Sequence, residues 1–142
     1  MSILTSTESA KVMDLTVISS SRNELIDITE KIQDKVRLSG KKNGLCFVFV
    51  PHTTAAVTIN ENADPSVRRD ILNTLSHVFT KDPSHEHTEG NSDAHIKTSL
   101  VGSSEIVAVD NGTLVLGTWQ SIFFCEFDGP RTRHVMVRII EG

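Results

Sequence analysis

The sequence predicts an α+β fold with a large mixed, mainly antiparallel sheet and two main helices. Two segments carry apolar residues at helical spacing, and both precede a long polar stretch. Several short strand-like segments joined by turn residues follow that stretch. The expected order is β-α-β-β-α, a loop, and then four strands, and the whole chain, residues 1–142, is expected to form one domain.

The N-terminal part predicts a strand followed by an amphipathic helix. Residues 12–18 alternate apolar and polar side chains, the period-2 pattern of a half-buried strand. Ser21 or Asn23 is a suitable N-cap for the helix, and Gly40 ends it. The apolar stripe of this helix consists of Leu25, Ile28, Ile32 and Val36.

Two further strands and a second helix are expected next. Residues 45–50 are short, apolar and rich in aromatic and β-branched side chains, which predicts a strand buried on both faces. Residues 55–60 form another extended segment. Asp64 is a good N-cap and Pro65 suits the first helical position, so a helix is expected over 65–78. Its apolar stripe consists of Val67, Ile71, Leu75 and Val78.

A polar segment, residues 80–94, lacks apolar periodicity and is predicted to be a long loop, a common location for function. Four strands are expected after it, at 105–109, 113–118, 121–127 and 134–140. Asn111-Gly112 is a strong hairpin signal between the first two strands. The last two are expected to pair with each other.

Composition narrows the class of protein. The chain has 142 residues, a mass of 15.6 kDa and a net charge of −4, which argues against a surface that coats nucleic acid. No apolar stretch reaches the length of a membrane helix, so no membrane span is expected. Cys46 and Cys125 lie inside apolar runs and are expected to be buried, reduced thiols of a cytoplasmic protein.

Histidines are the main candidates for chemistry. His77 and His134 are expected to be structural or solvent-facing. The candidates for metal ligation or acid–base catalysis are His52, His85, His87 and His95. Their spacing is not a specific metal signature, so a plain polar surface loop stays an equal alternative.

Charged and aromatic residues near these histidines add further candidates. Carboxylates could orient imidazoles or bind magnesium, and they occur at Glu61, Asp64, Glu86, Glu89 and Asp93. Arginine forks suit phosphate recognition, and the cationic candidates are Lys97, Arg131, Arg133 and Arg138. Trp119 is expected in the core, with stacking on a planar ligand as the alternative.

Three ordered blocks resemble the YjbQ family, whose members are described as secondary thiamine-phosphate synthases. The blocks are PHTTAAVTINENADPSVRRD, HTEGNSDAHIKTSLVG and GTLVLGTWQSIFFCEFDGPRTR. The resemblance covers nearly the whole chain after residue 10 and implies a homotrimer of α+β subunits. It also implies a modest activity on phosphorylated small molecules, in which a pyrimidine diphosphate is joined to a thiazole phosphate and diphosphate is released.

The same resemblance suggests residue roles. His85 matches no histidine of the family and is left out of the site. The expected ligands of a divalent metal, zinc in the first place, are His52, His87 and His95. Magnesium is a further expectation for the diphosphate. The expected catalytic residues are His52, Glu89 and Lys97. The expected substrate-binding residues are Thr53, Thr54, Asn60, Asn62, Asn91, Trp119, Arg131 and Arg133.

Two other functions fit these residues. One is a metal-dependent phosphate-ester hydrolase that uses a metal-bound hydroxide. The other is a non-catalytic trimeric protein that binds a small anion or metabolite, in which the histidines serve recognition only.

Overall fold

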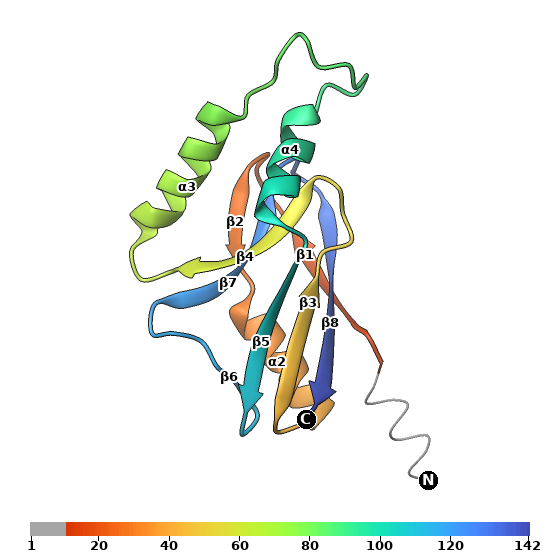
Figure 1. Ribbon diagram of the computed structural model, residues 1–142, viewed down its shortest axis with the longest axis vertical. Helices are drawn as coiled ribbons and strands as arrows, with labels where there is room; N and C mark the ends of the chain where they lie inside the picture. Colours follow the sequence, from red (N-terminus) through yellow and green to blue (C-terminus); the bar gives the residue numbers. More distant parts are fainter. Residues whose placement is uncertain (1–10) are drawn as a thin grey trace.

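The computed structural model describes residues 11–142 and confirms the α+β class (Figure 1). Three α-helices are described, α2 (Thr29–Ser39), α3 (Pro65–Val78) and α4 (Ser92–Val101). The strands are β1 (Met13–Ile18), β2 (Glu24–Asp27), β3 (Gly44–Phe49), β4 (Ala55–Glu61), β5 (Ser104–Asp110), β6 (Thr113–Leu114), β7 (Gln120–Glu126) and β8 (Thr132–Glu141). None of the helices in this part of the chain is long and apolar enough to span a membrane.

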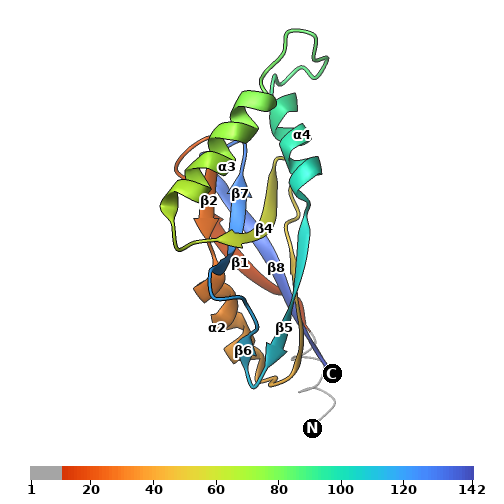
Figure 2. The ribbon, with the colours of Figure 1, turned by 60° about the vertical axis from the view of Figure 1, so that its left-hand side comes forward.

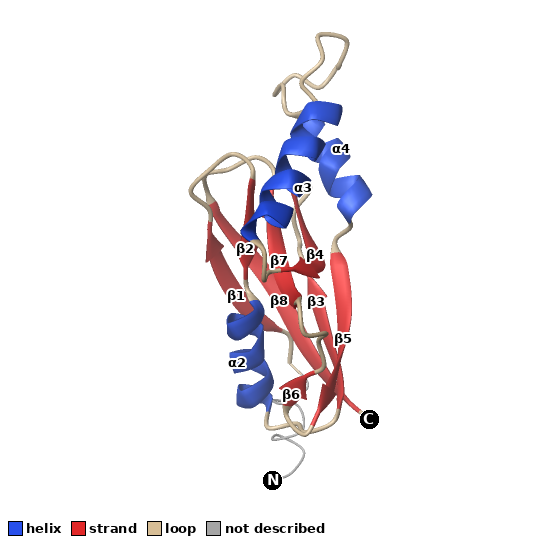
Figure 3. Cartoon of the chain, turned by 90° about the vertical axis from the view of Figure 1, so that its left-hand side faces the viewer, coloured by secondary structure: helices blue, strands red, loops and turns tan. Residues whose placement is uncertain are grey.

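The strands form two sheets, and every pairing described for residues 11–142 is antiparallel, which confirms the mainly antiparallel character expected from the sequence. Five strands lie in the order β1-β8-β3-β5-β6, and three lie in the order β2-β7-β4. Helix α2 lies near one end of the molecule, whereas α3 and α4 lie together toward the other end (Figure 1, Figure 2 and Figure 3).

Two apolar clusters hold the layers together. The larger one joins α2, the inner face of the five-stranded sheet and one face of the three-stranded sheet, with Ile32, Val48 and Phe124 at its centre. The smaller one covers the opposite face of the three-stranded sheet, where Phe123 and Cys125 meet partly buried residues of α3. Strand β7 is therefore buried on both faces. Strand β3 instead alternates buried and more exposed residues, so the prediction that residues 45–50 are buried on both faces is wrong.

Three local expectations are confirmed. Helix α3 spans the predicted residues 65–78, and the Asp64 carboxylate accepts a hydrogen bond from the Ser66 N–H as its N-cap. Asn111 and Gly112 both adopt positive φ angles, of 50° and 77°, as a tight hairpin turn requires. Both cysteines are buried free thiols.

Tertiary contacts overrode other local patterns. Residues 24–27 are a strand that pairs with β7, so the first helix begins only at Thr29. Residues 92–101 form a helix that the sequence did not predict, because its buried side carries mainly polar residues. Strands β7 and β8 belong to different sheets and do not pair, and the strand expected at 113–118 has only two residues.

Candidate functional site

A polar pocket lies where the β3–β4 connection meets helix α4. Its volume is about 380 Å³, and it is lined by His52, Thr53, His95, Thr98, Ser99, Gly102 and Ser103. His52 and Thr53 follow β3, whereas His95 and Thr98 lie three residues apart on α4, so they share one helix face. The Thr98 hydroxyl oxygen is buried without a hydrogen-bond partner. Two imidazoles and several hydroxyls thus face one cavity, which we call the histidine pocket.

A hydrogen bond sets the tautomer of His52, and burial favours its neutral form. The backbone N–H of His134 donates to Nε2 of His52 at 2.9 Å. Burial, followed by the nearby charges of Arg133 and His134, lowers the pKa of His52 below its ordinary value. A ring that accepts at Nε2 and is neutral carries its proton on Nδ1. In this arrangement His52 presents an N–H donor, and metal ligation by the neutral ring would require the His134 bond to open.

His87 contacts His95 from the loop that precedes α4. Its ring lies edge-on to that of His95, with centroids 5.2 Å apart. His87 itself is exposed. Among residues 11–142, no group of three or more His, Cys, Asp or Glu side chains gathers in an arrangement that could hold a metal ion. The three-histidine zinc site therefore stays a prediction. His95 shares the pocket with His52 and has ring contact with His87.

Lys97, an expected catalytic residue, lies on the buried side of α4 in a network of charged side chains. Only 1% of it is exposed. Its Nζ donates to the Asn23 side-chain oxygen at 3.1 Å and lies 3.7 Å from the Asp93 carboxylate. Burial lowers the pKa of Lys97, and Asp93 opposes that shift. Arg22 binds both carboxylate oxygens of Asp93 at 2.9 and 3.1 Å.

This network continues to Asn91 and Asp128. The Asn91 side-chain amide donates to the Asp128 carboxylate at 2.7 Å, while the Asn91 side-chain oxygen is buried and unpartnered. Arg131 donates to the same carboxylate and to the Asp128 carbonyl, but its side chain is half exposed. Arg131 therefore stays accessible to an anion from solvent. Lys97 is buried and contacts other side chains of the network, Asn23 and Asp93.

A second buried pair lies behind the histidine pocket. Arg133 donates through Nε to the Glu126 carboxylate at 2.9 Å and through a terminal nitrogen to the Thr54 hydroxyl at 2.8 Å. Ser19 also donates to Glu126, at 2.7 Å. Burial opposes ionisation of Glu126, but these hydrogen bonds outweigh it and keep the pKa below its usual value. Arg133 and Thr54 thus bond each other and support the chain beside His52.

The remaining predicted residues lie elsewhere. Asn60 and Asn62 stand at the far end of β4, roughly 20 Å from Thr54 for a strand of this length. The Asn62 backbone N–H donates to the Trp119 carbonyl. Trp119 is 62% exposed, so its expected core position is wrong. Glu89 is exposed in the loop before α4. The predicted site residues therefore fall into one group around the histidine pocket and a second around Trp119.

Sequence reasoning did not single out Arg22, Thr98 or Glu126 in the pocket and its support. It named Asp93 and Lys97 as candidates but did not pair them with each other. Asp93 and Lys97 are four residues apart on α4, a spacing that would have indicated their pairing if the helix had been predicted. Thr98 belongs to the same unpredicted helix. Arg22 and Glu126 carry no local signal, because their partners are distant along the chain.

The comparisons with known proteins agree with this fold. The family model for UPF0047 protein YjbQ-like sequences matches residues 13–142. The UPF0047 protein MJ1081 of Methanocaldococcus jannaschii is 55% identical over 122 residues, covering 86% of this chain and 88% of its own. The UPF0047 protein YugU of Bacillus subtilis is 46% identical over 129 residues, covering 89% and 96%.

A solved structure extends the similarity to three dimensions. The crystal structure of an uncharacterized conserved protein of the YjbQ/UPF0047 family from Clostridium acetobutylicum superposes with a TM-score of 0.88 at 53% identity. The match covers 90% of this chain and 99% of that one. With the family model, the curated relatives and this structure in agreement, the chain belongs to the YjbQ/UPF0047 family.

Proposed function

We propose that the protein is a transferase of the thiamine-phosphate synthase type that binds its phosphorylated substrate at the histidine pocket. The main observation in support is that His52 and His95 line one cavity together with the hydroxyl residues Thr53 and Thr98. Imidazole N–H groups and hydroxyls are suitable donors to phosphate oxygens. The half-exposed Arg131 is a further cation for the same substrate.

The reaction places specific demands on these donors. The bond between the pyrimidinylmethyl carbon and the diphosphate oxygen breaks, and diphosphate leaves with the electron pair. The thiazole nitrogen supplies the electrons for the new carbon–nitrogen bond. Negative charge grows on the leaving oxygen, and preorganised donors stabilise such charge best. The Nδ1–H of neutral His52 is one such donor. Lys97, buried in its contacts with Asn23 and Asp93, holds in place the helix that carries His95.

A metal fits this proposal only in part. His87 and His95 are close enough in space to contribute two ligands, and imidazole is a common ligand of zinc. A third ligand would come from a rearranged His52, from water or from a neighbouring copy of the chain. A magnesium ion carried by the diphosphate is the alternative. The pair of rings also favours a second function, a metal-dependent phosphate-ester hydrolase.

Replacing His95 with alanine is expected to lower the turnover of thiamine-phosphate formation by about 100-fold or more, the usual effect of losing one preorganised donor to the developing negative charge. Product formation from the pyrimidine diphosphate and the thiazole phosphate would be followed by chromatography, with and without added zinc or magnesium. His77→Ala is the matched control, because His77 is an exposed histidine on α3, and it should keep full activity.

Three outcomes would overturn the proposal. Equal turnover of His95→Ala and wild type would remove the pocket from the reaction. Release of inorganic phosphate without thiamine phosphate would favour the hydrolase. Binding of phosphorylated ligands with no turnover under any metal condition would favour a non-catalytic binding protein.

We also propose that the protein works as a homotrimer in the cytoplasm, where its two buried thiols stay reduced. The outer face of the five-stranded sheet supports self-association, because it carries apolar side chains that are exposed to solvent, Leu45, Ile106 and Ile140, beside the partly exposed Phe47. Leu45 and Ile140 are paired across β3 and β8, and Phe47 is paired with Ile106 across β3 and β5. Exposed apolar faces of this extent commonly mark interfaces.

Phe47→Asp is expected to convert the trimer to monomer, because a buried charge on each of three copies would be left without a partner. Size-exclusion chromatography with light scattering measures the change. Leu38→Asp is the control, since Leu38 is 74% exposed on α2, away from this sheet face. A monomeric wild type, or a Phe47→Asp variant that stays trimeric, would exclude the proposed interface.

A further inference from the structure

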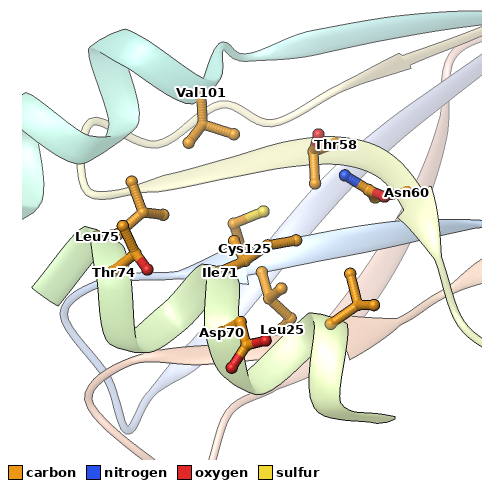
Figure 4. Close-up of a pocket in the computed structure, with 10 residues that line it drawn as sticks. Leu25, Thr58, Asn60, Asp70, Ile71, Thr74, Leu75, Val101 and Cys125 are labelled. Atoms are coloured by element: carbon orange, nitrogen blue, oxygen red, sulfur yellow. The ribbon is translucent and has the colours of Figure 1, made fainter. Parts of the chain in front are cut away.

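A second cavity lies between α3 and the three-stranded sheet, and the residues of the histidine pocket do not line it. Its volume is about 510 Å³, within the range of small-molecule sites. Leu25 of β2 and Cys125 of β7 form its floor, and Ile71 and Leu75 of α3 face them (Figure 4). Val101, at the end of α4, closes one side. We call this cavity the α3 groove.

The α3 groove exists because α3 packs loosely on the sheet. None of the 14 residues of this helix is fully buried. Val67, Ile71 and Leu75 follow one another at intervals of four, so they lie on one face of the helix, and all three line the groove. Water in contact with apolar walls is in an unfavourable environment. A ligand with apolar surface would displace that water favourably.

Polar groups stand at the borders of this apolar surface. Asp70 and Thr74 come from α3, and Thr58 and Asn60 come from β4 (Figure 4). Asp70 lies three positions after Val67 and four before Thr74, so its carboxylate borders the helix face that supplies the apolar wall. Asp70 is exposed, which places its negative charge at the mouth of the groove.

No other residue that lines the α3 groove is charged at neutral pH. Burial raises the pKa of the Cys125 thiol, which therefore stays protonated. Arg68 is a partly buried residue of α3. Its guanidinium lies over the Phe123 ring, 4.8 Å from the ring centroid, and donates to Asn62. Arg68 and Arg69 are not among the lining residues. The groove therefore combines an apolar interior with a single negative charge at its edge.

From this combination we infer that the α3 groove binds a small organic cation with a flat apolar body, such as an arylalkylammonium ion. The apolar body lies between Ile71 and the Cys125 floor, and the ammonium group pairs with Asp70. Thr58 and Asn60 offer further hydrogen-bond partners on the opposite side. This site is separate from the proposed transferase reaction and does not depend on it.

Three probes of similar shape test the inference: phenethylammonium, 2-phenylethanol and phenylacetate. Titrations followed by amide chemical shifts should give saturable changes at Thr58, Ile71 and Val101. Phenethylammonium should bind about two- to five-fold more tightly than 2-phenylethanol, the usual effect of one exposed ion pair, and phenylacetate should bind most weakly. Asp70→Asn should abolish the difference between the cation and the neutral probe, whereas Asp34→Asn on α2 should preserve it.

Filling the groove provides an independent check. Ile71→Phe and Leu75→Phe each enlarge a wall residue, and at least one of them should fold, as judged by circular dichroism, and lose probe binding. His95→Ala should keep probe binding, which separates this site from the histidine pocket. Absence of saturable shifts, shifts confined to the outer face of the five-stranded sheet, or tightest binding of phenylacetate would each overturn the inference. Shifts that depend on protein concentration alone would assign the groove to a second copy of the chain.

Discussion

Replacing Glu126 with glutamine is expected to lower the free energy of unfolding by about 3–5 kcal/mol, because it leaves a buried cation without its counter-charge. Glu126 is completely buried, and only 3% of the Arg133 side chain is exposed. The substitution keeps the size and most of the hydrogen-bonding capacity of the side chain and removes only the charge. Urea-induced unfolding at pH 7, followed by circular dichroism, measures the loss.

The double variant Glu126→Gln/Arg133→Met distinguishes a charge effect from a packing effect. Removing both charges should restore at least half of the stability, since replacing a buried ion pair with uncharged residues is often close to neutral. Arg37→Gln is the control for an exposed pair, because Arg37 and Asp34 are both more than half exposed, and its loss should stay below about 1 kcal/mol. A double variant less stable than Glu126→Gln would show that the charge pair is not the cause.

The loss caused by Glu126→Gln should also depend on pH. The folded-state pKa of Glu126 is held below its ordinary value of 4.5. The carboxylate therefore contributes stability that is fully present above that value and is lost as the pH falls through the folded-state pKa. The difference between wild type and Glu126→Gln should accordingly be constant near neutral pH and shrink below about pH 4.

Asp93→Asn is expected to have the second largest effect, a loss of about 2–3 kcal/mol, because Lys97 then keeps a buried charge without a carboxylate beside it. Asp93 is 3% exposed and binds both Arg22 and Lys97. The loss should be smaller than for Glu126, since 32% of the Arg22 side chain is exposed and water can solvate that guanidinium. Urea unfolding at pH 7 again provides the measurement.

Asp93→Asn/Lys97→Met tests the assignment. Lys97 is fully buried, so replacing its ammonium group with an apolar end of similar length should recover most of the stability lost by Asp93→Asn. The single variant Lys97→Met should unfold within about 1 kcal/mol of wild type, because Arg22 still neutralises Asp93. If Lys97→Met were the less stable of the two single variants, Asp93 would not be the residue that keeps the lysine charged.

An element could be predicted from the sequence when the residues that stabilise it lie within the same segment of the chain. Helix α3 was predicted to the residue because its N-cap, its proline and its apolar stripe all act within the segment. The hairpin at Asn111 was predicted for the same reason, since the turn depends on two backbone conformations. Helix α4 was missed because the residues it buries include Asp93 and Lys97, and a periodicity of apolar residues cannot reveal a helix whose buried side is charged.

The candidate site divides in the same way. The sequence by itself determined which residue types were present, that His52 follows an apolar segment, and that His87 lies within a polar segment with His95 directly after it. Only the tertiary structure decided that His52 and His95 share a pocket, that Trp119 stands apart from it, and that Arg133 is held by Glu126. Hydrogen bonds and ion pairs join residues far apart along the chain, and which of them meet depends on how the two sheets pack. A local pattern carries no record of that packing.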